Sequence, residues 1–114
     1  MGRVSFFASL LMVILSKPIL RAFGARHPAA AKPLNDWFAL VLAADWNSIA
    51  AMRRSYNSVD YVGQDRYIFN IGGNKFRLVA RVLFPARTVY IKFVGTHAEY
   101  DAIDPATVEY KKPL

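Results

Sequence analysis

Cysteine is absent from this 114-residue chain, and acidic side chains are scarce. Without cysteine there is no disulfide framework and no thiolate metal site, so the fold must depend on the burial of apolar side chains. Fifteen Lys and Arg residues against eight Asp and Glu residues give a formal net charge of +7. This excess favours a polyanionic partner, for which nucleic acid, an acidic protein segment and a membrane surface all qualify.

Common catalytic motifs are also missing. No glycine-rich phosphate loop opens a helix, and no histidine and glutamate have a metal-binding spacing. Asp101 and Asp104 lack further metal ligands, so we expect neither a metal nor a cofactor. The chemistry that remains is metal-free phosphodiester transfer in RNA. In that reaction the 2′-hydroxyl of the substrate is the nucleophile, and the protein supplies cations, a proton acceptor and a proton donor.

The sequence also lacks a long hydrophobic run, because the apolar stretch at residues 4–15 has only twelve members. A membrane-spanning helix needs about 20 apolar residues. No small-residue cleavage site follows the run at residues 16–18, which disfavours a secretory signal. We therefore expect no membrane association, a cytoplasmic location, and an N-terminal extension at residues 1–11 before an ancestral start at Met12. An extra helix over residues 1–11 that covers an apolar patch is the alternative.

The first half of the chain is expected to be helical. The length and an apolar fraction of 54% predict a single domain over residues 1–114. A short buried strand is expected at residues 12–15. Apolar side chains then recur at helical spacing in three segments: 16–27 with Ser16 as N-cap, 33–45 beginning at Pro33, and 48–56 behind an Asn47 or Ser48 cap.

The second half is expected to be a sheet, because from residue 59 the apolar side chains alternate and are β-branched or aromatic. Gly72 and Gly73 suit a tight two-residue hairpin loop. We expect the polar end, residues 105–114, to be frayed. The predicted strands cover residues 59–62, 66–71, 74–84 and 87–94.

The hairpin register predicts two different sheet faces. With a two-residue loop, Phe69 lies opposite Phe76 on an apolar face, and Ile68 lies opposite Arg77 on a polar face. Continuing the register places three further apolar pairs on the apolar face: Val82 with Val89, Ala80 with Ile91, and Leu78 with Phe93.

Basic residues are concentrated on the polar face. Residues 66–98 contain six Lys and Arg residues and no acidic residue. If helices cover only the apolar face, this cationic face stays open and concave and suits a phosphate backbone. A solvated sheet face whose charges prevent aggregation is the alternative interpretation. The face brings together Arg66, Asn70, Lys75, Arg77, Arg81, Tyr90 and Lys92.

His97 and Tyr100 follow the last predicted strand and would share one side of a short helical turn. They offer an imidazole, which titrates near neutrality, and a phenol, which donates a hydrogen bond or stacks on a base. Taken alone, either residue is more often structural.

Two motifs in the second half, FNIGGNKFRL and GTHAEYD, resemble those of the HigB toxin family of RelE-like toxins, and the resemblance covers about residues 12–104. It implies a RelE-like α+β fold, with N-terminal helices packed on one face of a mainly antiparallel sheet. It also implies cleavage of messenger RNA on translating ribosomes. The implied partner is a HigA-type helix-turn-helix antitoxin, through which the toxin associates indirectly with operator DNA.

The resemblance also implies roles for particular residues. Lys75 and Arg77 would bind the scissile phosphate, His97 would transfer a proton, and Tyr100 would stack on a base or assist as an acid. The residues expected to hold the RNA are Arg66, Asn70, Asn74, Arg81, Tyr90 and Lys92. Two alternatives stay open: a gyrase-poisoning toxin of the same fold, and a non-catalytic module that binds RNA or an antitoxin.

Overall fold

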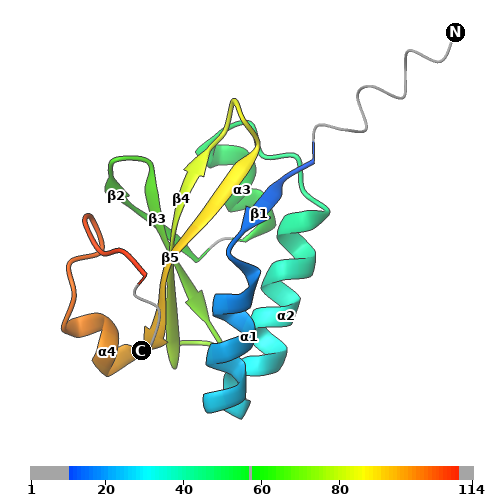
Figure 1. Ribbon diagram of the computed structural model, residues 1–114. Helices are drawn as coiled ribbons and strands as arrows, with labels where there is room; N and C mark the ends of the chain where they lie inside the picture. Colours follow the sequence, from blue (N-terminus) through cyan, green and yellow to red (C-terminus); the bar gives the residue numbers. More distant parts are fainter. Residues whose placement is uncertain (1–10, 57, 111–114) are drawn as a thin grey trace, which may run out of the picture.

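The computed structural model describes residues 11–56 and 58–110. This part of the chain forms one sheet of five strands, in the order β1-β5-β4-β3-β2, together with four helices (Figure 1). All neighbouring strands are antiparallel except β1 and β5, which are parallel. The α+β architecture predicted from the sequence is therefore confirmed. The strands are β1 (Val13–Leu15), β2 (Val59–Gly63), β3 (Arg66–Ile71), β4 (Phe76–Leu83) and β5 (Thr88–Thr96), and the helices are α1 (Lys17–Arg26), α2 (Pro28–Leu42), α3 (Ile49–Ser55) and α4 (His97–Asp101).

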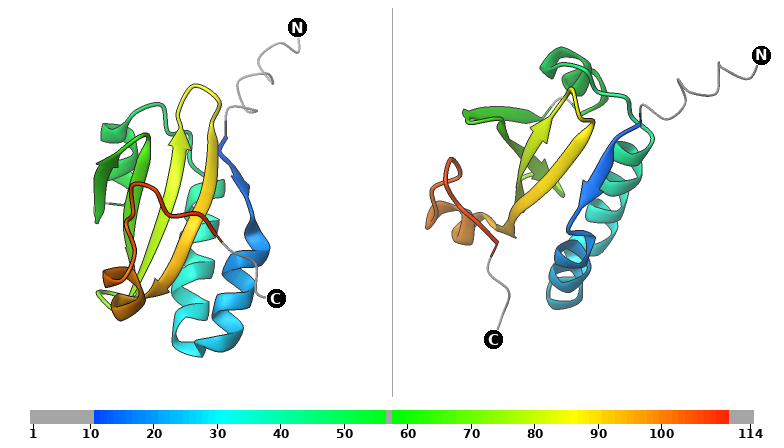
Figure 2. Two further views of the ribbon diagram at one scale, coloured as in Figure 1. Left: turned by 60° about the vertical axis from the view of Figure 1, so that its left-hand side comes forward. Right: turned by 45° about the horizontal axis from the view of Figure 1, so that its top comes forward.

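The two long helices lie on one face of the sheet, and α4 with the segment after it lies on the other (Figure 2). The main core forms between α1, α2 and the sheet. Phe69 lies at its centre, fully buried, with the ring of Trp37 at 5.4 Å and that of Trp46 at 6.2 Å. Burial of such aromatic side chains supplies most of the driving force for folding in a chain without disulfides.

The helices differ from the predictions mainly at their starts. The second helix begins at Pro28, five residues earlier than predicted, and Pro33 lies inside it. Three alanines at residues 29–31 favour the earlier start, since alanine has the highest helix propensity, and Pro28 suits the first helical position. The Ser48 side chain accepts a hydrogen bond from the Ala51 amide at 3.1 Å, as expected of an N-cap. Ser16 instead has a left-handed backbone (φ 79°) and makes no capping bond.

β1 is an edge strand rather than the buried strand that we expected. Val13 and Leu15 are 51% and 41% exposed, although Met12 just before them is buried. We expected an extension at residues 1–11, and residues 1–10 of it lie outside the described residues. No helix in residues 11–56 and 58–110 is long and apolar enough to span a membrane.

The β3–β4 hairpin has a four-residue loop at residues 72–75, not the two-residue loop that we predicted. Phe69 therefore pairs with Leu78, and Ile68 with Val79, so the predicted pairing of Phe69 with Phe76 is wrong. Gly72 and Gly73 both have positive φ, and the Lys75 amide donates to the Gly72 carbonyl at 3.4 Å. Because the error is two residues, the side chains of β3 and β4 still lie on the predicted faces.

A β-bulge in β5 changes the last part of the sheet. Ala80 pairs with Ile91 as predicted, but Val79 pairs with Phe93, which leaves Lys92 as the extra residue. The predicted pairing of Leu78 with Phe93 is therefore wrong. The bulge turns Phe93 away from the main core, to the face that carries the basic residues.

That cationic face is not open, as we expected, because the chain after β5 crosses it (Figure 2). Ile68 and Val79 lie on this face and are buried, yet neither belongs to the main core cluster. Residues 105–110, which we expected to fray, contact Arg66 and Lys92 through hydrogen bonds and two ion pairs. Residues 111–114, the rest of that segment, lie outside the described residues.

Candidate active site

A short helix at the end of β5 positions the two candidate proton-transfer residues. Thr96 caps this helix, α4, in a reciprocal arrangement. Its hydroxyl accepts a hydrogen bond from the Glu99 amide at 3.2 Å, and the Glu99 carboxylate accepts one from the Thr96 amide at 2.8 Å. The His97 amide then donates to the Lys75 carbonyl at 3.1 Å. Backbone contacts therefore hold α4 against the β3–β4 loop.

The four candidate catalytic residues lie at this corner of the sheet, where one side-chain contact and one backbone contact join them in pairs. The Arg77 guanidinium lies 5.9 Å from the centre of the Tyr100 ring, a cation–π contact. It also donates to the carbonyls of Asn74 and Phe76, both at 3.2 Å, which orient it. The backbone hydrogen bond from His97 to Lys75 joins α4 to the same loop, which also contains Asn74. The main chain therefore places the sequence-predicted catalytic residues at one corner: Lys75, Arg77, His97 and Tyr100.

The environment of Tyr100 keeps its phenol protonated. Partial burial raises the pKa of Tyr100 above its ordinary value. Arg77 acts in the opposite direction, while Asp60 and Asp101 raise the pKa further. The Phe93 ring, 6.5 Å from that of Tyr100, adds an apolar neighbour. Tyr100 is therefore a hydrogen-bond donor at neutral pH and not a phenolate base.

Asp101 is a site residue that sequence reasoning missed. Its Oδ2 lies 3.1 Å from Nδ1 of His97, and both side chains are more than half exposed. A carboxylate on Nδ1 fixes the imidazole ring and leaves Nε2 free for a proton. We considered Asp101 only as a metal ligand, although its position four residues after His97 on a short helix is the signal that could have found this contact.

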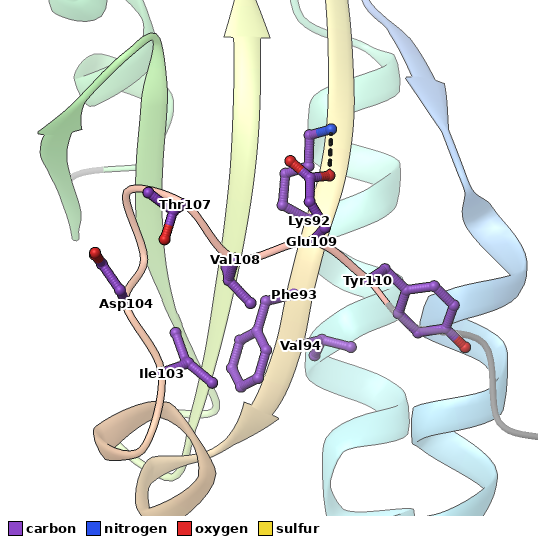
Figure 3. A pocket seen from close by; sticks show the side chains of 9 residues that line it. All are labelled: Lys92, Phe93, Val94, Ile103, Asp104, Thr107, Val108, Glu109 and Tyr110. Carbon is purple, nitrogen blue, oxygen red and sulfur yellow. Dashed lines mark hydrogen bonds and ion pairs between the residues drawn. The ribbon is translucent and has the colours of Figure 1, made fainter.

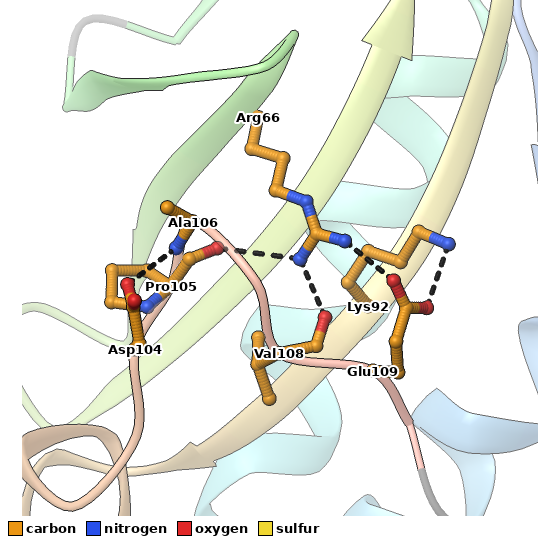
Figure 4. A network of polar contacts seen from close by, with 7 residues as sticks. All are labelled: Arg66, Lys92, Asp104, Pro105, Ala106, Val108 and Glu109. Carbon is orange, nitrogen blue, oxygen red and sulfur yellow. Dashed lines mark hydrogen bonds and ion pairs between the residues drawn. The ribbon is translucent and has the colours of Figure 1, made fainter.

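A second group of basic residues lies in the middle of the same face (Figure 4). Arg66 is only 7% exposed, and its guanidinium donates to the carbonyls of Pro105 and Val108 and, at 2.6 Å, to the Glu109 carboxylate. Lys92 donates to the other oxygen of Glu109 at 2.9 Å.

Glu109 was not a predicted site residue, and nothing in its local sequence indicates these partners. Hydrogen bonds from Lys92 and Arg66 hold the pKa of the Glu109 carboxyl below its ordinary value, against a small opposing effect of burial. Glu109 is therefore charged at neutral pH and neutralises part of the cationic face.

The remaining predicted RNA-binding residues are dispersed around these two groups. Arg81 is 3.9 Å from Asp65, and the Tyr90 ring centre is 5.9 Å from Nζ of Lys92. The Asn70 side chain donates to the Ser58 hydroxyl at 2.6 Å, toward the β2 edge. The structure therefore places these residues on the predicted face but does not gather them into one pocket.

The described residues contain no group of three or more His, Asp or Glu side chains arranged to hold a metal ion. Within residues 11–56 and 58–110, the polar groups gathered at the corner beside α4 are cations, an imidazole with its carboxylate, and a protonated phenol. Such a set can stabilise a negative charge that develops on phosphorus and can move protons, without a metal.

Comparison with known proteins gives consistent matches. The model of the family described as "HigB_toxin, RelE-like toxic component of a toxin-antitoxin system" matches residues 30–103. The mRNA interferase HigB of Escherichia coli O6:H1 is 26% identical over 94 residues, which cover 81% of this chain and 91% of that protein. The mRNA interferase toxin HigB of Escherichia coli K12 and the mRNA interferase HigB of Shigella flexneri are each 43% identical over 54 residues. For these two proteins the match covers 47% of this chain and 51% of the relative.

Proposed function

This chain belongs to the HigB family of RelE-like toxins, and on that premise we propose that it is an endoribonuclease that cleaves messenger RNA. The family resemblance inferred from the two sequence motifs is thereby confirmed. The relatives' names describe the same activity. The observation that carries the proposal for this chain is the contact of the Arg77 guanidinium with the Tyr100 ring, beside the backbone hydrogen bond that joins His97 to Lys75 at the same corner of the cationic face.

In the proposed reaction the 2′-hydroxyl of RNA attacks the adjacent phosphorus. His97 accepts the proton of that hydroxyl, and Asp101 orients the imidazole ring. Arg77 and Lys75 stabilise the negative charge of the phosphorane. The bond from phosphorus to the 5′-oxygen then breaks, and Tyr100, which is protonated at neutral pH, donates its proton to the leaving oxygen. Proton exchange with water afterwards returns Tyr100 and His97 to their starting states. The products are a 2′,3′-cyclic phosphate and a 5′-hydroxyl.

The partners follow from the same family membership. As the toxic component of a toxin–antitoxin system, the chain has an antitoxin partner. We propose that this antitoxin is of the HigA helix-turn-helix type and carries the toxin to operator DNA. We propose further that the messenger RNA is cleaved on the ribosome, in the cytoplasm.

Controlled expression with mapping of transcript ends tests the proposed activity. We expect translation to stop and transcripts to be cut at internal sites within minutes of induction, while the folded His97→Ala variant leaves transcripts intact. Induction of a DNA damage response with intact transcripts would instead indicate a gyrase poison. If expression caused neither transcript cleavage nor a DNA damage response, the protein would be one that only binds RNA or its antitoxin.

The dependence of RNA binding on salt tests the cationic face as the docking surface. The logarithm of the binding constant for single-stranded RNA falls linearly with the logarithm of the salt concentration, with a slope of about −0.7 for each phosphate that is neutralised. If four cations each neutralise one phosphate, the expected slope is near −3. The four proposed cations are Lys75, Arg77, Arg81 and Lys92. Binding of a non-cleavable RNA oligonucleotide, measured by fluorescence anisotropy between about 50 and 200 mM salt, gives this slope. A slope near zero would contradict the assignment.

A further inference from the structure

The contacts of Glu109 resemble those that a phosphate group would make. Each carboxylate oxygen accepts a hydrogen bond from a different cation, Oε2 from Arg66 at 2.6 Å and Oε1 from Lys92 at 2.9 Å. Two non-bridging oxygens of a phosphodiester accept hydrogen bonds in the same way and carry the same single negative charge. Exchanging the Glu109 carboxylate for a phosphodiester would therefore leave the net charge around Arg66 and Lys92 unchanged.

The Arg66 guanidinium needs such an anion. Its side chain is only 7% exposed, and burial of a charged group is unfavourable unless the group is paired and hydrogen-bonded. Among residues 11–56 and 58–110, its hydrogen-bond partners all come from the segment at residues 104–110: the Glu109 carboxylate and the carbonyls of Pro105 and Val108 (Figure 4). A ligand that displaced this segment would have to offer anionic oxygens.

The same segment borders an open pocket on the sheet. This pocket, of about 650 Å³, lies between the segment and β5 and is lined mainly by apolar side chains, with Phe93 and Ile103 on its walls and Lys92 and Glu109 at its edge (Figure 3). Close packing is what makes displacement of a buried element costly. Since apolar side chains of the segment line this open pocket, its packing on the sheet is incomplete there, and its polar contacts with Arg66 and Lys92 add to its attachment.

We propose that Arg66 and Lys92 form a binding site for a backbone phosphate of RNA, which the Glu109 carboxylate occupies in the free protein. RNA then displaces residues 104–110 when it extends from the catalytic corner along the cationic face. This inference rests on the proposed function, since it takes RNA as the ligand. It adds a competitor within the chain that neither the family match nor the relatives indicate.

Neutralising Glu109 tests the competition. The Glu109→Gln variant keeps the side-chain shape but weakens both contacts. We expect it to bind a 2′-O-methyl RNA 12-mer about fivefold more tightly than the unaltered protein, as the weakening of two ion pairs that compete with RNA implies. Asp36→Asn is the matched control, because it removes the same charge from an exposed pair with Lys32 on α2. Its affinity should change by less than about twofold, since charges beyond about one Debye length are largely screened.

Movement of the segment is tested in the full-length chain with a label. Because the sequence has no cysteine, Thr107→Cys provides a single attachment point for a nitroxide on the exposed surface of the segment. We expect the electron paramagnetic resonance spectrum to change from slow to fast label motion when the 12-mer saturates the protein. An unchanged spectrum at saturation, or a Glu109→Gln affinity within about twofold of the unaltered protein, would overturn the proposal.

The two proposals fail in different ways. If transcripts stay intact on expression while the 12-mer still displaces the labelled segment, the nuclease assignment is wrong and the phosphate site stands. If transcripts are cut but the label stays immobile in the RNA complex, the nuclease assignment stands. In that second case Arg66 serves only to anchor the C-terminal segment.

Discussion

Replacing His97 with alanine is expected to lower the rate of RNA cleavage about 10²-fold or more, the usual loss when a general acid or base is removed. The reason is positional: capping by Thr96 and the bond to the Lys75 carbonyl fix the start of α4 at the catalytic corner, and Asp101 orients the imidazole. The measurement is single-turnover cleavage of a synthetic RNA, or of a translated messenger if the reaction requires ribosomes.

The second histidine of the chain provides the matched control. His27 stacks on Phe23 with ring centres 4.4 Å apart, at the end of α1. His27→Ala should therefore alter stability but leave the cleavage rate per folded molecule nearly unchanged. Asp101→Asn should lower the rate less than His97→Ala and shift its pH profile, as expected if Asp101 acts by positioning the imidazole. A folded His97→Ala variant that keeps full activity would remove His97 from the reaction.

Replacing Arg77 with alanine is expected to lower cleavage by about 10²-fold to 10³-fold, similar to the loss of a hydrogen-bond donor to a developing oxyanion. Arg77 is held by two backbone carbonyls and by the Tyr100 ring, so its guanidinium is already oriented before substrate binds. Single-turnover rates at saturating RNA separate this effect from weaker binding.

Two further variants make the Arg77 test specific. Arg77→Lys keeps the charge but loses the planar set of donors, so it should recover only part of the activity. Arg21→Ala removes an equal charge from the exposed side of α1 and should leave the rate nearly unchanged. Equal rates for Arg77→Ala and Arg21→Ala would show that Arg77 contributes only to the overall charge.

Much of the catalytic corner could be predicted because it depends on local patterns. Alternation along β3 and β4 assigns Arg77 to the polar face whether the hairpin loop has two residues or four, since only an odd error moves side chains across the sheet. His97 and Tyr100 follow β5 directly in the chain. A one-turn helix at that point places both of them at the end of the sheet.

The features that could not be predicted depend on contacts between distant parts of the chain. The bulge at Lys92 has no glycine or proline to indicate it, and it turned Phe93 to the other face. Arg66 forms an ion pair with Glu109, which lies 43 residues later in the chain, and nothing in the sequence near either residue indicates this pairing. A surplus of basic residues on one sheet face indicates that anions will be bound there, but not that one of them belongs to the same chain.

The parallel pairing of β1 with β5 also bears on how the molecule folds. Val13 lies beside Thr88 in this pairing, whereas β2, β3 and β4 each pair with the next strand along the chain. Contacts between residues so far apart in sequence carry a larger loop-closure entropy and form more slowly than hairpins. We therefore expect the four-strand meander to assemble first, with docking of the N-terminal edge strand as the slow, late event on the folding pathway.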